Sequence, residues 1–189
     1  TAESPLLLDG LSFRVEAGEF VSILGPSGAG KSSLFRLMNG LLAPESGSIS
    51  VGGLPVSEKR RCCGYMPQQD LLFPWRTVAE NVGLPLELGE RPDGVAERKE
   101  RVKEVLAAVG LGDWAEKSPL ALSGGMRQRA AFARTLLTGA ELLLLDEPFS
   151  ALDYMTRLSM REWLLERWQQ EKRTILFVTH DVEEAVFLS

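Results

Sequence analysis

The residues best suited to chemistry lie in a glycine-rich loop with the spacing G-x-x-x-x-G-K-[ST]. The apolar run Phe20–Leu24 leads into the loop and a helix-forming stretch, 34–42, leads out of it. Glycines let successive backbone N–H groups point into one concavity at the positive end of the following helix. Because both flanks fit, the pattern predicts a nucleotide phosphate site rather than a glycine turn beside a surface lysine. The loop comprises Gly25, Pro26, Ser27, Gly28, Ala29, Gly30, Lys31, Ser32 and Ser33.

Two further groups in the chain suit a bound triphosphate and its metal ion. Lys31 is expected to reach the β- and γ-phosphates, and Ser32 to offer its hydroxyl to Mg²⁺. The apolar run Leu142–Leu145 ends at Asp146 and Glu147. A carboxylate at the tip of a buried strand can hold Mg²⁺, and Glu147 can polarise the water that attacks the γ-phosphate. Two carboxylates that end a strand are often only solvated, but the glycine loop in the same chain favours catalysis.

His180 is the only histidine of the sequence and follows the strand-like run Thr174–Val178. A lone histidine is more often structural than catalytic. Its position argues otherwise, because Thr179-His180-Asp181 falls on the edge of the sheet where Glu147 is expected. There the imidazole could hydrogen-bond the γ-phosphate and the attacking water.

A second predicted anion site opens with Ser123, Gly124 and Gly125 at the start of a helix. A chain that binds one triphosphate does not need two such sites. We therefore expect this one to serve a nucleotide held by a second copy. An ordinary N-capped helix would explain the serine but not the paired glycines.

Strands and helices must alternate to position these groups, with the polar residues just after the strands. The run Ala17-Gly18-Glu19 predicts a hairpin-like pair of strands on either side of it. Four more strand-like stretches and four helices follow. The expected strands are Leu11–Val15, Phe20–Leu24, Ser48–Val51, Gly64–Pro67, Leu142–Leu145 and Thr174–Val178. The expected helices run over Lys31–Leu41, from Ser123 to about Thr138, from Asp153 onward, and over 181–189. The helix that starts at Asp153 is expected to carry Met155, Leu158, Leu165 and Trp168 on one face.

Between about 77 and 140 the sequence carries no strand signal, which predicts a helical insertion. Thr77 or Asn81 can start one helix, and Asp93 can cap another. The second helix is expected to end at Gly110 and to bury one apolar stripe. The stripe consists of Val95, Val102, Val105, Leu106 and Val109.

The overall composition predicts a single globular domain with a core of ordinary size. Of the 189 residues, 44% are hydrophobic and 25% charged, and the net charge is −5. The acidic balance argues against a nucleic-acid partner, and no apolar run is long enough to span a bilayer. The adjacent Cys62 and Cys63 are expected to be reduced thiols. Neither end has the signals of a natural terminus, so a fragment is expected.

In combination, these motifs resemble the ATP-binding subunit of an ATP-binding cassette (ABC) transporter. The resemblance covers nearly all of the chain and keeps the family's order of motifs. These are the Walker A loop Gly25–Ser33, the Q-loop at Gln68, the family sequence Leu122–Gln128, the Walker B run Leu142–Asp146 with Glu147, the D-loop Ser150–Asp153 and the switch histidine His180.

The resemblance implies an α/β fold with a P-loop NTPase (RecA-like) core, N-terminal β-strands and an inserted α-helical subdomain. The core is expected at 1–76 and 140–189 and the helical subdomain at 77–139. Two such cassettes would pack head to tail, each ATP lying between Lys31 of one copy and Ser123–Gly125 of the other. Gln68 would sense Mg²⁺, with Ser32 and Asp146 as further ligands, and Asp153 would contribute to the ATP site.

The resemblance also implies partners and a location. The Q-loop would lie in the groove that receives a transmembrane permease, and the aromatic stretch Phe73–Trp75 suits that groove, with packing between subdomains as the alternative. The stretch from Pro67 to Val78 is similar to ATPases of importers for nitrate, sulfonates, taurine and hydroxymethylpyrimidine. This places the subunit at the cytoplasmic face of the cell membrane, with an extracytoplasmic solute-binding protein as an indirect partner.

Three departures from the family pattern are visible. No aromatic residue precedes Phe13 to stack on the adenine, the strands that usually follow His180 are absent, and Ser33 replaces the usual threonine.

Two alternative functions are open. A soluble ABC ATPase acting on DNA or ribosomes is the first; it is disfavoured by the lack of a coiled coil between Lys31 and Asp146 and by the acidic charge. A P-loop kinase or GTPase is the second alternative. Such an enzyme would not need the second anion site at Ser123–Gly125, so the presence of that site disfavours it.

Overall fold

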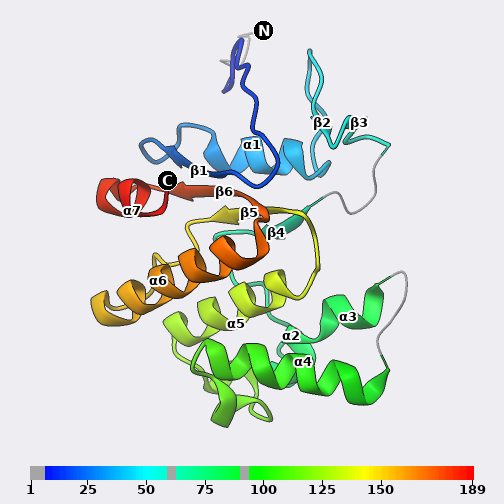
Figure 1. The fold of residues 1–189 in the computed structure, drawn as a ribbon, viewed down its shortest axis with the longest axis vertical. Helices are drawn as coiled ribbons and strands as arrows, with labels where there is room; N and C mark the ends of the chain where they lie inside the picture. The colour runs from blue at the N-terminus through cyan, green and yellow to red at the C-terminus, as the bar shows by residue number, and fades with distance from the viewer. Residues whose placement is uncertain (1–6, 59–62, 90–93) are drawn as a thin grey trace, which may run out of the picture.

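A computed structural model describes residues 7–58, 63–89 and 94–189 of the chain. Its main sheet has four parallel strands in the order β1-β6-β5-β4 (Figure 1). The strands are β1 Phe20–Leu24, β4 Gly64–Met66, β5 Leu142–Asp146 and β6 Thr174–Thr179. Because all four run the same way, the loops that follow them emerge at one edge of the sheet.

Helices cover both faces of the sheet (Figure 1). On one side lies α1 with a small antiparallel hairpin, and on the other side lie α5 and α6, with α2, α3 and α4 farther out. The elements are α1 Lys31–Met38, β2 Ser50–Val51, β3 Leu54–Pro55, α2 Val78–Val82, α3 Leu84–Leu88, α4 Val95–Ala108, α5 Gly124–Leu136, α6 Tyr154–Glu171 and α7 Val182–Leu188, with 3₁₀ turns at Gly112–Trp114 and Pro119–Ala121. None of the described helices is long and apolar enough to cross a membrane.

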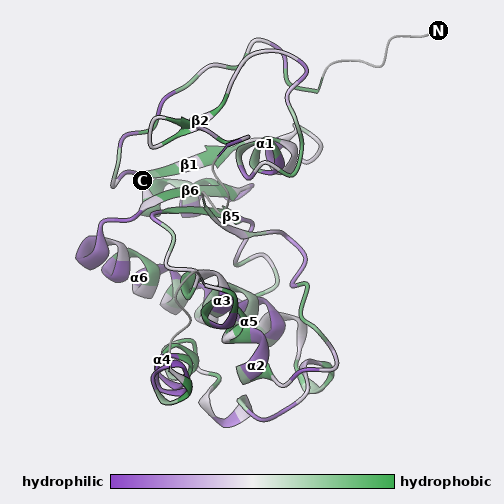
Figure 2. Cartoon of the chain, turned by 90° about the vertical axis from the view of Figure 1, so that its right-hand side faces the viewer, coloured by the Kyte–Doolittle hydropathy of each residue, from purple (hydrophilic) through white to green (hydrophobic). Residues whose placement is uncertain are grey.

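The central strand β5 shows why the sheet needs helices on both sides. Its side chains alternate between the two faces, since successive residues of a strand point in opposite directions. Leu142 and Leu144 join the core under α1, whereas Leu143 and Leu145 join the larger core toward α5 and α6. All five residues of β5 are buried, as predicted for a parallel strand covered on both faces. Figure 2 shows this hydrophobic middle layer in green.

Short polar side chains fix where the helices start. Thr77 opens α2 with a capping box: its hydroxyl accepts from the N–H of Glu80, whose carboxylate accepts from the N–H of Thr77. The side chains of Ser123, Asp153 and Asp181 cap α5, α6 and α7 by accepting from the backbone N–H three residues further on. These caps lie at the loops that carry the candidate chemistry, so they set the positions of those loops as well.

The described residues between 77 and 139 form helices and contain no strand. Within α4, Val102 and Leu106 are buried, and Val109 follows them into the same core. Val95, predicted to share this stripe, is 62% exposed because it lies in the first turn, beyond the neighbouring helices. The proposed cap Asp93 lies outside the described residues, and α4 begins after Gly94.

The predicted N-terminal hairpin is wrong, because residues 11–15 form no strand in the structure. The backbone of β1 pairs in parallel with β6, and the turn before it is held by a hydrogen bond from Gly18 N to Thr174 Oγ1. Leu11 and Phe13 are about half exposed, and Val15 packs against the core under α1. The alternation of apolar residues was therefore not sufficient for a strand without a neighbouring strand to pair with.

One predicted helix end and one predicted helix face also differ from the structure. Helix α1 ends at Met38 because Asn39 and the positive-φ Gly40 turn the chain, which leaves Leu41 exposed and buries Phe35 instead. In α6 the buried residues are Met160, Arg161 and Leu164, whereas Met155 is 69% exposed. The Cys63 thiol donates a hydrogen bond to Asn39 Oδ1 at 2.9 Å, and Cys62 lies outside the described residues.

Candidate active site

The polar residues singled out in the sequence gather at the carboxyl edge of the sheet. The glycine loop follows β1, Gln68 follows β4, Glu147 follows β5 and His180 follows β6. In an open parallel sheet this edge is where ligands bind, because the loops there diverge and leave a crevice. The order of the strands thus brings together residues as far apart in the sequence as Gly25 and His180.

The glycine loop has the backbone shape that a phosphate cradle requires. Gly28 and Gly30 have φ angles of 84° and 88°, a region that residues with a Cβ rarely occupy. The first turn of α1 has no side-chain cap, so its N–H groups remain available to an anion. The Lys31 ammonium donates to the carbonyl oxygens of Gly25 and Pro26 at 2.6 and 2.8 Å, so it lies over the concavity of the loop.

Asp146 ends β5 with its carboxyl group almost fully buried. Burial raises its pKa, and the neighbouring Glu147 carboxylate raises it further, while a hydrogen bond with Ser32 and the charge of Lys31 lower it. A cation bound beside the Asp146 carboxyl group would therefore favour its ionised form. One carboxylate and one hydroxyl suit Mg²⁺, which takes its other ligands from phosphate and water. The described residues contain no all-protein cluster of three or more acidic, histidine or cysteine ligands.

Glu147 is the point at which three of the loops meet. Its Oε2 atom lies 3.3 Å from Gln68 Nε2 and 3.4 Å from His180 Nδ1. Its φ angle is 50°, in the left-handed region, and its N–H donates to the carbonyl of Val178 at 3.0 Å. A non-glycine residue in this conformation is held there by its surroundings and is common at functional sites. The Glu147 side chain is 14% exposed and that of His180 60%.

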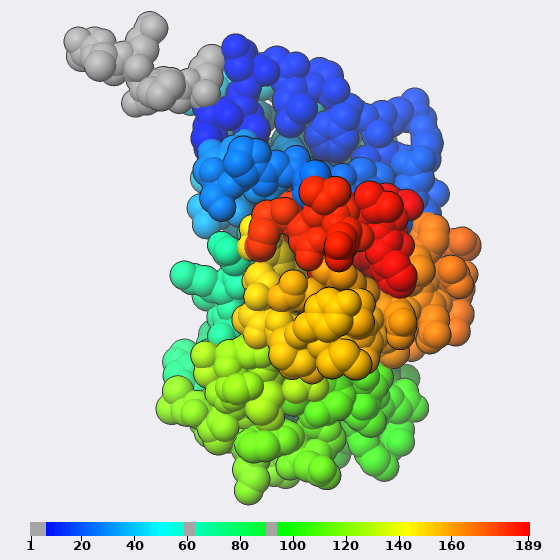
Figure 3. All heavy atoms as spheres, turned by 90° about the vertical axis from the view of Figure 1, so that its left-hand side faces the viewer, coloured from blue at the N-terminus to red at the C-terminus, as the bar shows by residue number. Residues whose placement is uncertain are grey.

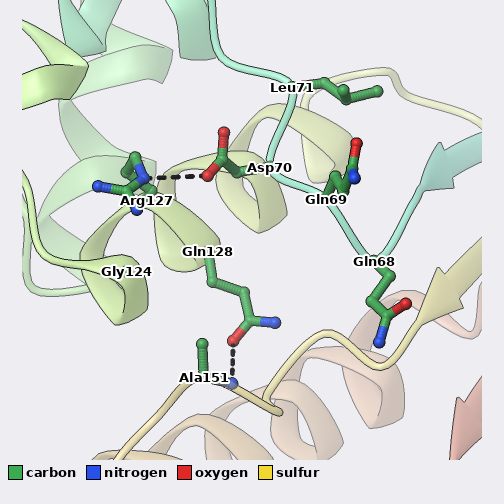
Figure 4. A pocket seen from close by; sticks show the side chains of 8 residues that line it. All are labelled: Gln68, Gln69, Asp70, Leu71, Gly124, Arg127, Gln128 and Ala151. Carbon is green, nitrogen blue, oxygen red and sulfur yellow. Dashed lines mark hydrogen bonds and ion pairs between the residues drawn. The ribbon is translucent and has the colours of Figure 1, made fainter.

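The serine and glycines at the start of α5 lie across a cleft from Gln68. The cleft has a volume of about 410 Å³ and is lined by Gln68, Gln69, Asp70, Leu71, Gly124, Arg127, Gln128 and Ala151 (Figure 4). Of the predicted anion-site residues Ser123, Gly124 and Gly125, Gly124 lines this cleft, opposite Gln68. Asp153 lies beyond Ala151 at the start of α6.

The paired glycines at the start of α5 differ in their surroundings. A Cβ on Gly125 would lie 3.0 Å from the carbonyl oxygen of Ala151, whereas one on Gly124 would meet only the far end of Arg127. Gly125 thus allows α5 to approach the loop before α6 within the same chain. The sequence interpretation assigned both glycines to an anion site and missed this packing role.

Gln128 is a residue whose contacts the sequence analysis did not anticipate. It is buried in α5, and its Nε2 donates to the Glu147 carbonyl at 2.9 Å and to Ser150 Oγ at 3.1 Å. Its Oε1 accepts from the N–H of Ala151 at 2.8 Å, a bond drawn in Figure 4. The side chain therefore fixes both ends of the loop after Glu147. A polar residue on the buried face of a helix was the only signal for it in the sequence.

Two arginines of α5 hold the loop that carries Gln68. Arg127 Nε donates to Asp70 Oδ2 at 3.0 Å (Figure 4), and Arg134 donates to the carbonyls of Asp70 and Leu71 at 2.7 and 2.8 Å. Leu71 has a φ angle of 45°. Burial lowers the pKa of Arg134 from its high ordinary value, an effect that the charge of Asp70 opposes. The loop is thus pinned on both sides of a strained residue.

The aromatic stretch after this loop is anchored by one buried amide. Asn81 accepts from the N–H of Phe73 and donates to the carbonyls of Phe73, Arg76 and Thr77. Phe73 stacks on Trp75 with ring centroids 5.1 Å apart, yet Trp75 is 76% exposed. Asn81 was predicted only as a possible helix start, and Thr77 takes that position.

Comparison with known proteins identifies relatives of this arrangement. The ABC transporter family profile matches residues 8–150. The chain is 49% identical to the formylaminopyrimidine import ATP-binding protein ThiZ of Halalkalibacterium halodurans, over 100% of this chain and 72% of that protein. It is 42% identical to the aliphatic sulfonates import ATP-binding protein SsuB of Bacillus cereus, over 97% and 71%. The ATP-binding cassette MJ0796, a dimer in a post-hydrolysis state with ADP and Pi, superposes with a TM-score of 0.90 at 34% identity, covering 96% of this chain and 83% of that one.

Proposed function

Because the chain belongs to the ABC transporter family, as an ATP-binding and ATP-hydrolysing subunit that energises import through a separate permease, we propose that the sheet-edge residues divide the work of hydrolysis as follows. The glycine loop Gly25–Gly30 and the first turn of α1 bind the phosphates. Lys31 leaves the carbonyls of its own loop for the β- and γ-phosphate oxygens. Ser32 and Asp146 hold Mg²⁺, and Gln68 reaches it from the neighbouring loop.

Glu147 is the general base in this proposal. The observation that carries it is the convergence of Gln68 and His180 on one carboxylate oxygen of Glu147. A water held between these groups attacks the γ-phosphorus while its proton passes to Glu147, and the bond to the β-phosphate oxygen breaks to release ADP. His180 orients the water and the γ-phosphate. When bound, Mg²⁺ neutralises charge that develops on the phosphates.

The second wall of the cleft serves a second copy of the chain. Ser123, Gly124 and Gly125 begin a helix whose N-terminal N–H groups suit an anion, and the chain already has one phosphate loop. In the proposed head-to-tail homodimer these residues close over the γ-phosphate bound by the partner, with Asp153 at the same interface. The dimeric form of the similar cassette MJ0796 supports this arrangement.

The loop from Phe73 to Trp75 is the proposed contact with the permease. A tryptophan that is 76% exposed beside a rigidly held backbone is suited to be covered by another protein. The subunit then works at the cytoplasmic face of the membrane, and an extracytoplasmic solute-binding protein delivers the solute. Residues 77–139 form the helical subdomain in this scheme, and 1–76 with 140–189 form the core. The names of the relatives support a small organic solute.

Trapping the dimer tests the proposed role of Glu147. Glu147→Gln keeps the shape and the contacts of the side chain but cannot accept the proton, so ATP stays bound and the dimer accumulates. Light scattering at saturating MgATP is expected to show a dimer, and Lys31→Ala in the same background is expected to remain monomeric. A Glu147→Gln protein that hydrolyses ATP at the wild-type rate would remove Glu147 from the role of base.

A further inference from the structure

We propose that Arg157 is a positioning residue that ties the loop ending at Asp153 to the switch histidine His180. The inference rests on the proposed function, because it gives Arg157 an effect only through His180. Arg157 lies in the first turns of α6, and it touches neither the glycine loop nor Glu147 through any hydrogen bond seen in the described residues. Its contacts go instead to the backbone on one side and to a carboxylate on the other.

The two residues that flank His180 are held firmly by hydrogen bonds. Asp181 caps α7 by accepting from the N–H of Glu184 at 3.1 Å, and its own N–H donates to Thr179 Oγ1 at 3.0 Å. The Thr179 hydroxyl donates to Glu184 Oε2 at 2.5 Å. Both residues that flank His180 are thus bound into the start of α7, whereas the imidazole itself is largely exposed.

A buried ion pair lies between α6 and the start of α7, next to His180. Arg161 of α6 donates to Glu184 Oε1 at 2.9 Å and to Asp181 Oδ2 at 3.1 Å. The side chains of Arg161 and Glu184 are only 6% and 7% exposed. A buried ion pair of this kind contributes little net stability, because desolvation of the charges offsets their attraction. Its effect is on geometry, since it fixes the start of α7 against α6.

Arg157 joins this frame to the loop before α6. Its Nη2 donates to the carbonyl of Leu152 at 3.0 Å, and its Nη1 lies 3.7 Å from Asp181 Oδ2. Leu152 immediately precedes Asp153, and Asp181 immediately follows His180. The guanidinium therefore spans the two loops, one proposed to meet the partner copy and one proposed to orient the water. Its Nε is buried and has no hydrogen-bond partner among the described residues.

The space between the two loops is small and shared. A cavity of about 30 Å³ is lined by Arg157, by Asp181 at one end of the bridge and by the proposed base Glu147. Its lining includes Glu147, Ser150, Arg157, Thr179, His180 and Asp181. Figure 3 shows the surface of α7, in red, directly against the yellow and orange surface that continues through the loop into α6. Through the contacts of Arg157 with Leu152 and Asp181, a shift of Ser150–Asp153 is expected to reach His180.

The planar fork of arginine holds its two acceptors at a fixed angle and separation. Arg157→Lys keeps the charge and most of the aliphatic stem, but its shorter side chain ends in a point charge without the rigid fork, so Leu152 and Asp181 are held less firmly in register. We expect Arg157→Lys to lower kcat for ATP roughly tenfold while KM for ATP changes less than about twofold, since positioning of the water and not ATP binding is affected. Arg157→Ala has the same effect or a larger one. Arg167→Ala, on the exposed side of the same helix, leaves both constants unchanged.

His180 is the only histidine of the 189 residues, so histidine-selective NMR of the untagged subunit reads its imidazole directly. His180→Ala assigns the signal. The ring signals are expected to shift in Arg157→Lys, in the presence of a non-hydrolysable ATP analogue, and not in Arg167→Ala. A lower kcat with unchanged ring signals, or shifted signals with unchanged kcat, overturns the proposal, and the lysine variant keeps the test valid if the alanine variant is unstable. If His180→Ala hydrolyses ATP normally, the proposed role of His180 fails instead.

Discussion

Replacement of Gln128 by methionine tests how far the catalytic loop depends on one buried amide. Methionine has a similar length and keeps the core filled, so the substitution removes hydrogen bonds without opening a large cavity. Three bonds are lost: two donated by Nε2, to the Glu147 carbonyl and Ser150 Oγ, and one accepted from the N–H of Ala151. These bonds hold both ends of the loop that begins at Glu147, the residue proposed as the base.

The stability cost follows from what remains bonded after the substitution. The Glu147 carbonyl still accepts from the N–H and the hydroxyl of Ser150, and the exposed Ala151 can turn its N–H to water. No group is left fully unsatisfied, so the expected loss is about 1–2 kcal/mol of unfolding free energy rather than the full penalty of a buried unpaired group. Glu147, by contrast, is held at a φ of 50°, and loss of that restraint is expected to lower kcat by about tenfold or more.

Urea denaturation and steady-state ATPase assays measure the two effects on the same Gln128→Met protein. Gln169→Met, on the exposed part of α6, is the matched control and is expected to change neither. The reasoning is refuted if kcat stays at the wild-type value while stability falls, because Gln128 then supports the fold but not the loop. It is equally refuted by a stability loss so large that the variant is unfolded at 25 °C.

Three further predictions concern the supports of the other loops. Gly125→Ala is expected to push the Ala151 carbonyl, 3.0 Å from the new Cβ, and to reduce ATPase activity more than stability; equal activity would show that the loop yields freely. Asn81→Ala leaves the Phe73 N–H without its partner, while the Phe73 carbonyl still accepts from the N–H of Arg76, and thermal or urea unfolding should show a loss of about 1–3 kcal/mol. The backbone N–H of Glu184, and then Arg161, lower the pKa of Asp181, so its carboxylate stabilises the fold above its unfolded pKa of about 3.9. That contribution is lost as the pH falls through the lower folded pKa, and Asp181→Asn should therefore show a shallower acid limb in a pH series of unfolding free energies.

The order of the motifs was enough to predict the sheet edge and the residues on it. Strand ends at Asp146 and Thr179 follow from apolar runs that stop at polar residues, and parallel pairing then brings their loops together. Helix starts at Thr77, Ser123 and Asp153 were equally visible, because a cap is a local contact between residues three apart. Local chemistry of this kind survives in the sequence without knowledge of the fold.

The predictions that failed depended on pairing partners. An alternation of apolar residues at 11–15 indicates one apolar face, but a strand also needs a neighbour, and β1 already pairs with β6. Helix α1 was extended to Leu41 because its apolar spacing continues, although Asn39 and Gly40 end it. In both regions the apolar pattern was real and the backbone geometry overrode it.

The supports of the site could not be predicted, because each one is a tertiary contact made by a residue of ordinary type. Gln128, Arg134 and Asn81 bind backbone groups 4 to 64 positions away, and nothing in their immediate sequence distinguishes them from solvated polar residues. Their burial is the signal, and burial is known only once the helices are packed. The same holds for Arg157 and Arg161 behind His180.

Helix α5 links features that the sequence suggested only as separate motifs. Its first turn carries Ser123–Gly125, its buried face holds the loop after Glu147 through Gln128, and Arg127 and Arg134 hold the loop after Gln68. A rigid-body movement of α5 must therefore either carry both of these loops with it or break charge-assisted and buried hydrogen bonds, each of which costs about 1–3 kcal/mol. Carrying the loops is the less costly path. In the proposed dimer, closure of the start of α5 over the partner's nucleotide would therefore move the loops of Gln68 and Glu147 in the same chain.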